Sequence, residues 1–109
     1  MQIRSGPFFT AGASVSDVLS LGMLKPLMII TPAAWTAPAN LRFLYSPDNA
    51  NFYPLCLENH VWEVQCLPNS AIKLSMRDWP TYSFFKFMSS FGGSEIPQLE
   101  ERVFQMIGD

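Results

Sequence analysis

The clearest structural signal in this chain is the segment Leu41-Arg-Phe-Leu-Tyr-Ser-Pro-Asp-Asn-Ala-Asn-Phe-Tyr-Pro-Leu55. In an extended backbone, Leu41, Phe43 and Tyr45 share one face, and Arg42 and Leu44 share the other. The next four residues, Ser-Pro-Asp-Asn, supply a turn, because proline fixes φ while Asp and Asn hydrogen-bond to the local backbone and tolerate positive φ. An apolar run then resumes. The segment therefore predicts a strand, a tight turn and a second strand, which is typical of an antiparallel β-domain.

Short segments of the same kind, separated by turn signals, fill the rest of the chain. Residues 82–89 alternate most regularly, with Phe85 and Phe87 on the face opposite Phe84 and Lys86. Nine prolines suit loops and strand edges and disfavour helices. The spacing predicts an all-β fold, a jelly-roll-like antiparallel β-sandwich of about seven or eight strands. The expected strands are 16–21, 23–31, 40–46, 51–57, 61–66, 70–76, 82–89 and 96–107, the last of which also fits the start of a helix.

The length of 109 residues predicts one folded domain. We assign residues 15–109 to the β-sandwich and residues 1–14 to an extended N-terminal arm, which glycine, proline and small residues punctuate. Ile3, Phe8 and Phe9 give this arm apolar side chains that can dock on a neighbouring subunit. The alternative for the same residues is a frayed terminus.

The composition indicates a surface that needs a partner. Apolar residues make up 49% of the chain and aromatic residues 14%, whereas charged residues make up only 15%, against roughly 25% in an average soluble domain. Monomeric proteins rarely expose large contiguous apolar patches. We therefore expect contacts with other subunits, including self-association as a dimer or trimer.

Charge and hydropathy exclude several kinds of partner. The net charge is −2 and the seven basic residues are scattered, so we expect no nucleic-acid binding. The longest apolar run, 27–30, is far too short to span a bilayer, and we expect no membrane association. The N-terminus does not read as a signal peptide, which predicts synthesis in a cytoplasm. There we expect Cys56 and Cys66 to be buried, inert thiols, although they could also face each other across a hairpin.

No combination of residues in the sequence predicts catalysis. His60 is the single histidine, and we place it in an exposed turn. The chain has no Gly-x-Ser-x-Gly segment, and its Gly92-Gly93 pair lacks the Lys and Ser/Thr of a phosphate-binding loop. We predict a protein that is not an enzyme and that uses no cofactor or metal.

Carbohydrate binding is the one small-ligand function that the residues suggest. Trp35 and Trp79 lie beside prolines in loops and are candidates to stack on sugar rings or to contact a protein partner. Asp48 and Asn51 supply polar groups for a glycan, and the same oxygen-rich turn is compatible with Ca²⁺, although a plain turn explains it as well. Trp62 lies in an alternating segment, which favours a place in the core.

Several segments resemble those of small virion proteins of tailed bacteriophages. Residues 29–55 are similar to a Pro-x-x-Trp loop followed by a Leu-x-Phe strand and an Asp-Gly turn, and residues 71–74, 82–90 and 96–104 are similar to later strands of that group. Asn49 stands where Gly is usual, and Met88 where Arg is usual. The same strand–turn–strand also resembles discoidin-like, galactose-binding jelly rolls, which implies a β-sandwich.

Two functions follow from this resemblance and from the composition. The first is a structural protein of a virion, made in the host cytoplasm, that acts as a capsid cement or decoration protein or as a neck or tail accessory. It would bind the major capsid protein or other virion proteins through Ile3, Phe8, Phe9, Trp35 and Trp79. The second is a carbohydrate-binding module on a tail or host-facing appendage, with Trp35, Asp48, Asn51 and Trp79 as its candidate site.

Overall fold

A computed structural model describes residues 1–57, 60–74 and 82–109 of the chain. In these ranges every regular element is a β-strand and all strand pairs are antiparallel. The predicted all-β sandwich is therefore confirmed. The strands are β1 (Gln2–Phe9), β2 (Leu19–Ser20), β3 (Pro26–Ile30), β4 (Asn40–Ser46), β5 (Tyr53–Pro54), β6 (Cys56–Leu57), β7 (His60–Val61), β8 (Glu63–Gln65), β9 (Ala71–Lys73), β10 (Phe84–Phe91), β11 (Ser94–Glu95) and β12 (Arg102–Gly108).

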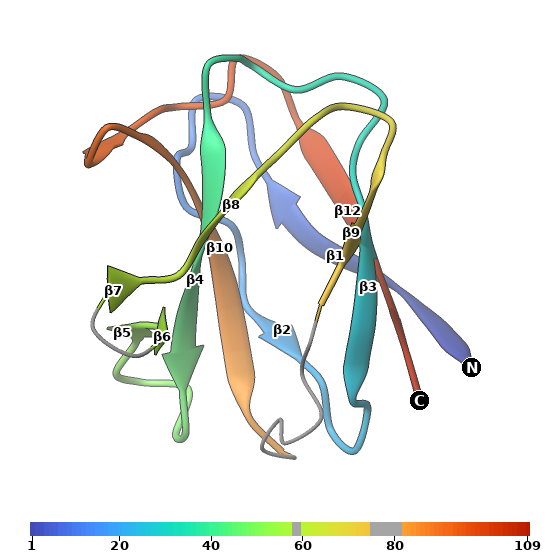
Figure 1. Cartoon of the computed structure of the whole chain (residues 1–109). Helices are drawn as coiled ribbons and strands as arrows, with labels where there is room; N and C mark the ends of the chain where they lie inside the picture. Colours follow the sequence, from blue (N-terminus) through green and yellow to red (C-terminus); the bar gives the residue numbers. More distant parts are fainter. Residues whose placement is uncertain (58–59, 75–81) are drawn as a thin grey trace.

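Two sheets form the layers of the sandwich. The four-stranded sheet has the order β1-β12-β3-β9, and the six-stranded sheet has the order β11-β10-β4-β5, with β2 added to β10 and β8 added to β4. Figure 1 shows β4 and β10 on one side of the molecule and β3 and β12 on the other. A small separate hairpin joins β6 to β7.

The segment around β4 folds as its pattern predicts. Leu41 and Phe43 are buried, whereas Arg42 and Leu44 on the other face are partly exposed. The turn after β4 is closed by side chains: the Ser46 hydroxyl accepts a hydrogen bond from the backbone N–H of Asn49 at 2.9 Å. Asn49 itself has φ of 60°, the left-handed conformation that Asn tolerates better than most residues. The chain then returns as β5, which pairs with β4.

Aromatic rings link the two sheets across the core. Phe104 of β12 is fully buried, and its ring centroid lies 5.2 Å from that of Phe87 in β10. Phe87 lies 5.1 Å from Phe43 in β4, which in turn lies 4.4 Å from Trp62. Trp62 packs against the core, as expected. The Phe87–Phe104 and Phe43–Phe87 pairs are edge-to-face, and such pairs contribute about 0.5–1.5 kcal/mol each beyond the burial of their area.

The N-terminal residues correct our prediction of a separate arm. Residues 2–9 form β1, an edge strand paired with β12 along its length, and Phe9 is fully buried in the core. The pairing register shifts between Ser5 and Phe8, where Gly6 has φ of 116°, a conformation that residues with a Cβ rarely adopt. Because the bulge interrupts the alternation of inward and outward residues, the strand could not be recognised from the sequence pattern. The division of the chain at residue 14 does not match the sheet, since β1 is part of the sandwich.

The strand boundaries also differ from those predicted. Several expected strands contain short breaks, so that 51–57 becomes β5 and β6, and 61–66 becomes parts of β7 and β8. The expected strand 96–107 begins only at Arg102 and is a strand rather than a helix. The predicted strand 70–76 runs partly outside the described residues, since β9 ends at Lys73 and residues 75–81 are not described.

Candidate docking surface

The outer face of the four-stranded sheet is the candidate functional site. Phe104 and Met106 of β12 and Ile29 of β3 point into the core, where each is almost completely buried. Because successive side chains of a strand point to opposite sides, Val103, Gln105 and Ile107 lie on the outside. The same argument places Met28 and Ile30 of β3 there.

The pairing register arranges this face in three rows across the strands. The first row is Ile3, Ile107, Met28 and Lys73, the second is Ser5, Gln105, Ile30 and Ala71, and the third is Phe8 and Val103. We call these ten residues the outer apolar face. Its members come from four segments far apart in the sequence. Cross-strand neighbours of this kind lie about 4.5–5.5 Å apart, so the apolar members of each row are in contact. Ser5 and Gln105 are polar members of the middle row.

Exposure supports this assignment. Ile3 is 64% exposed, Val103 39% and Phe8 37%, and Met28, Ile30 and Ile107 between them are partly exposed. Lys73, at the β9 edge, is the only charged side chain of the face. Among the members on the two central strands, Gln105 is polar and the others are apolar. A largely apolar surface with few charges resembles the central part of a protein–protein interface.

The outer face of the six-stranded sheet is more polar, although Leu44, Phe84 and Met88 also lie on it. Glu63 of β8 accepts hydrogen bonds from Arg42 at 2.8 Å, from Asn40 at 3.1 Å and from Ser90 at 3.2 Å. The pKa of the Glu63 carboxyl is lowered, chiefly by the hydrogen bond from Arg42 and further by those from Asn40 and Ser90, while desolvation acts against the shift. This face satisfies its own polar groups.

The residues predicted to bind a partner divide between the surface and the core. Ile3 and Phe8 lie on the outer apolar face, as a docking role requires. Phe9 is fully buried between the sheets, so it is removed from the candidates. Trp79 lies outside the described residues.

Trp35 is also removed, because it is 7% exposed and belongs to the core. Its ring centroid lies 5.5 Å from that of Phe9 and 5.4 Å from that of Phe104. The indole N–H donates to the carbonyl of Ala39 at 3.0 Å. We expected a surface position because Trp35 lies in a loop, but the loop folds over the end of the sandwich and inserts the ring.

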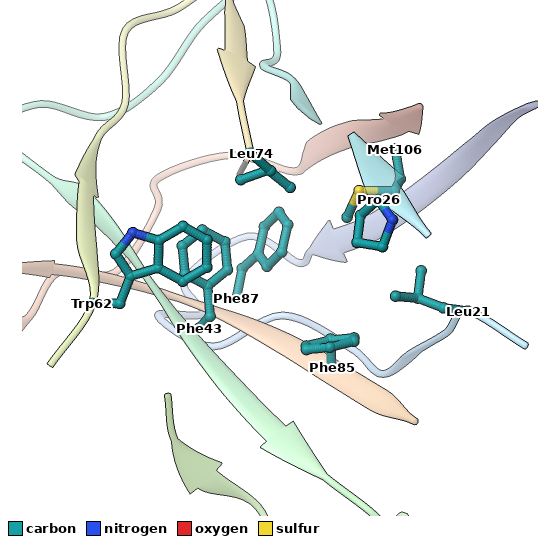
Figure 2. Close-up of a pocket in the computed structure, with 8 residues that line it drawn as sticks. All are labelled: Leu21, Pro26, Phe43, Trp62, Leu74, Phe85, Phe87 and Met106. Carbon is teal, nitrogen blue, oxygen red and sulfur yellow. The ribbon is translucent and has the colours of Figure 1, made fainter. Parts of the chain in front are cut away.

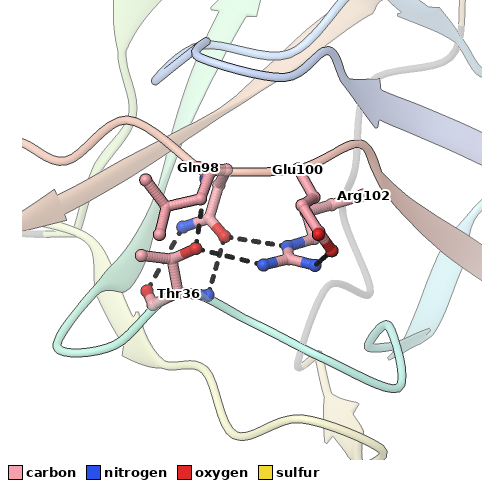
Figure 3. A network of polar contacts seen from close by, with 5 residues as sticks. Thr36, Gln98, Glu100 and Arg102 are labelled. Atoms are coloured by element: carbon pink, nitrogen blue, oxygen red, sulfur yellow. Dashed lines mark hydrogen bonds and ion pairs between the residues drawn. The ribbon is translucent and has the colours of Figure 1, made fainter.

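A buried polar network holds this loop in place (Figure 3). Gln98 is fully buried, and its Oε1 accepts from the backbone N–H of Thr36 at 2.8 Å and from Nε of Arg102 at 3.1 Å. Its Nε2 donates to the carbonyl of Thr36 and to the hydroxyl of Ser89. The Arg102 guanidinium also lies 3.7 Å from Glu100. Because every polar atom of Gln98 has a partner, the network fits a structural role.

The proposed glycan residues of the 46–51 turn are engaged in the turn itself. One carboxylate oxygen of Asp48 accepts from the backbone N–H groups of Ala50 at 2.9 Å and Asn51 at 3.0 Å, and from the Ser46 hydroxyl at 2.9 Å. The Asn51 side chain donates to the other oxygen at 3.2 Å. The backbone donors of Asn51 and then Ala50, followed by Ser46, hold the pKa of the Asp48 carboxyl well below its ordinary value. The arrangement explains why Asp48 and Asn51 occur here.

A hollow lined by apolar side chains lies between the two sheets (Figure 2). The space in it that is open to a water-sized molecule is only about 10 Å³, roughly enough for one water. Small-ligand sites generally add a few polar groups that orient the ligand, whereas the indole nitrogen of Trp62 is the only side-chain nitrogen or oxygen among the described lining residues. The lining residues are Leu21, Pro26, Phe43, Trp62, Leu74, Phe85, Phe87 and Met106.

The remaining reactive side chains are separate from one another. Cys66 is buried, as predicted, and burial raises the pKa of its thiol to about 12. Cys56 is exposed rather than buried, and the two thiols are free. His60 is exposed, as expected, although it lies in the short strand β7. Within residues 1–57, 60–74 and 82–109, no three His, Cys, Asp or Glu side chains are grouped so as to hold a metal ion.

Comparisons with known proteins add no identification. No family model, no curated protein and no solved structure matches this chain. In the part of the chain that the structure describes, no helix has the length and apolar character needed to cross a membrane.

Proposed function

We propose that this protein is a non-enzymatic structural component of a tailed-phage virion, most specifically a capsid decoration protein that stabilises the shell by contacts between neighbouring subunits. The observation that carries this proposal is the outer apolar face of the four-stranded sheet. We propose a virion as the assembly because four segments of the chain resemble those of small virion proteins, namely residues 29–55, 71–74, 82–90 and 96–104.

The physical basis of the proposal is the burial of this face in an assembly. Each 100 Å² of apolar area removed from water contributes about 2.5 kcal/mol before the costs of association are subtracted. Ile3, Phe8 and Val103 offer such area without any change in the fold, since they are already exposed. In a shell the same contact is repeated at every site, so a modest gain per copy stabilises the whole particle.

Docking by the face is favoured over the addition of a strand to the edge of β1. At the far end of β1, the backbone N–H of Phe8 donates to the Asp17 carboxylate at 2.8 Å, and the carbonyl of Phe8 accepts from the backbone of Asp17. Pro7 has no N–H to offer, and Arg4 reaches the carbonyl of Ser20 at 3.2 Å. Features of this kind protect an edge strand from further pairing.

The experiment that tests this function begins with particles from cells that make the chain. Gold-labelled antibody against the protein should decorate the shell in a regular pattern. Particles made without the chain should release their contents at lower temperature and regain stability when purified protein is added. Particles that carry no label while the chain stays in the soluble fraction would contradict the proposal.

Two variants then test whether the protein attaches to particles through the outer apolar face. Ile3→Glu places a charge on the outer apolar face, and Leu99→Glu is the matched control, since Leu99 is 75% exposed outside that face. We expect particle attachment to weaken strongly for the first variant and to remain for the second. The carbohydrate alternative is not proposed, because Trp35 is buried and Asp48 and Asn51 are engaged in their turn.

A further inference from the structure

We propose that the outer edge of β9 binds an extended, acidic segment of a different protein, which joins the four-stranded sheet as an added strand. This contact goes beyond the docking of the outer apolar face, and either one can exist without the other. Its basis is the backbone of β9, which ends the sheet on one side, together with the charge of Lys73.

The hydrogen bonds between β3 and β9 show which backbone groups of β9 are already used. The N–H of Leu74 donates to the carbonyl of Leu27 at 2.9 Å, and the N–H of Thr31 donates to the carbonyl of Ser70 at 2.8 Å. In an antiparallel ladder, residues bonded to the partner strand alternate with residues whose backbone groups point the other way. Every second residue of β9 therefore turns its N–H and C=O groups outward.

Ala71 and Lys73 are the two residues with outward backbone groups. They pair with Ile30 and Met28 at the positions between the hydrogen-bonded ones, and both are exposed. Within residues 1–57, 60–74 and 82–109, no hydrogen bond reaches the N–H or C=O of either residue. These four groups form a row with which an extended peptide can pair, while the ladder to β3 stays intact.

The opposite edge of the same sheet is closed to an added strand. Along β1, Pro7 has no N–H, the Asp17 carboxylate accepts from the N–H of Phe8, and Arg4 reaches the carbonyl of Ser20. β9 contains no proline, and no side chain in the described part of the chain bonds to its outward groups. The sheet can therefore grow at β9 and not at β1.

Lys73 indicates the chemistry of the added segment. Its neighbour on β3 is Met28, and among the described residues no carboxylate forms an ion pair with its ammonium. An added strand places one side chain directly opposite Lys73, where a negative charge is favourable and a positive charge is unfavourable. The β9 strand of a second copy would bring another lysine and no acidic side chain, so a different protein fits this edge better.

The contact is weak when it acts alone. β9 has three residues, so it offers four backbone hydrogen bonds and one charge pair. We expect half-saturation by a short free peptide at about 1 mM. A segment of a neighbouring subunit that is held close by another contact reaches an effective concentration in the millimolar range, and the edge is then occupied.

The test titrates the full chain with synthetic peptides and follows its backbone amides by nuclear magnetic resonance. The probe is a blocked peptide in which two valines separate a central glutamate from terminal threonines, and the matched probe has lysine in place of glutamate. The amide signals of Ala71 and Lys73 should shift on binding of the glutamate peptide. The lysine peptide should bind at least about threefold more weakly, because its charge repels that of Lys73.

Substitutions in β9 separate pairing at the edge from other binding. Ala71→Pro removes one outward N–H, and proline is tolerated in an edge strand where its nitrogen faces solvent. We expect about fivefold weaker binding of the glutamate peptide, whereas the matched control Ala71→Val keeps the N–H and should bind as the wild type does. Lys73→Glu should reverse the preference between the two peptides, and this outcome does not depend on how the chain tolerates proline.

Several results would overturn the proposal. One is the absence of a shift at Ala71 and Lys73 up to about 10 mM peptide, and another is equal binding of the two peptides by the wild type and by Lys73→Glu. Slow hydrogen exchange at these two amides in the free chain would show that the edge is already paired. A shift of the same amides that rises with protein concentration, without peptide, would assign the edge to a second copy. None of these results bears on the outer apolar face, which Ile3→Glu tests.

Discussion

The two sheets of this protein have apolar inner faces, and their outer faces differ in composition. On the six-stranded sheet, Arg42 and Asn40 of β4 each donate a hydrogen bond to Glu63 of the neighbouring strand β8. On the four-stranded sheet, the corresponding outer positions hold Ile107, Met28 and Ile30. The inner faces form the core, and the difference between the outer faces is the reason why we propose that a partner binds to the four-stranded sheet.

Aromatic side chains are also covered differently on the two outer faces. On the side of the six-stranded sheet, the Lys86 ammonium lies 4.5 Å from the centroid of the Phe52 ring, a cation–π contact that covers an otherwise exposed aromatic surface. On the outer apolar face, Phe8 and Val103 pair across strands but remain more than a third exposed. Because no side chain of this kind is seen to cover Phe8 among the described residues, we expect another molecule to cover the outer apolar face.

The largest expected difference in stability is between a substitution on the inner face of β12 and one on its outer face. Phe104→Ala should lower the free energy of unfolding by about 3–5 kcal/mol, because it leaves a cavity among buried rings. Val103→Thr, one residue away on the outer face, keeps the β-branched shape and should cost less than about 0.5 kcal/mol. Urea unfolding of dilute protein measures both, and similar losses would contradict the assignment of faces.

A smaller effect is expected on the polar outer face. Glu63→Gln should lower the free energy of unfolding by about 1 kcal/mol at neutral pH, because it weakens the charged hydrogen bond with Arg42. The pKa of Glu63 is lowered in the folded state, so its carboxylate stabilises the fold above about pH 4.5, its ordinary pKa, and this contribution is lost as pH falls through the lower folded value.

The difference between wild type and Glu63→Gln should therefore shrink as the solution is acidified below pH 4.5. Glu101→Gln removes the same charge from an exposed residue and serves as the control. Equal effects of the two substitutions at every pH would mean that the polar network does not stabilise this sheet.

The smallest effect concerns the two thiols. A maleimide at pH 7 should modify exposed Cys56 and spare Cys66, whose pKa of about 12 and burial leave almost no accessible thiolate. Since Cys56 is not part of the outer apolar face, the labelled protein should unfold and associate as before. Mass spectrometry checks this, and two labels on the folded chain would contradict it.

The sequence was sufficient to group the residues of single strands by face. The alternation of residues 40–46 and 82–89 put Leu41 with Phe43 and Phe85 with Phe87, and the structure buries both of these faces. It was not sufficient for β1, because the bulge at Gly6 interrupts the alternation. Trp35 was misplaced for a related reason, since nothing local shows that a loop will fold back over the core.

The outer apolar face could not be predicted as a unit, because it depends on pairing between segments separated by most of the chain. Ile3, Ile107 and Met28 become neighbours only through the register of β1, β12 and β3. One local signal was present. In an antiparallel sheet with one wet face, the uninterrupted apolar run 27–30 already indicates that both faces of that strand are apolar.

The most direct test of the central claim compares the oxidation of two methionine side chains by dilute hydrogen peroxide. Met28 lies on the outer apolar face and Met88 on the outer face of the six-stranded sheet, and both are partly exposed in the single chain. Both should be oxidised in the free protein. In particles that carry the protein, Met28 should become protected while Met88 stays accessible. Equal oxidation of the two side chains in free and in attached protein would contradict the account.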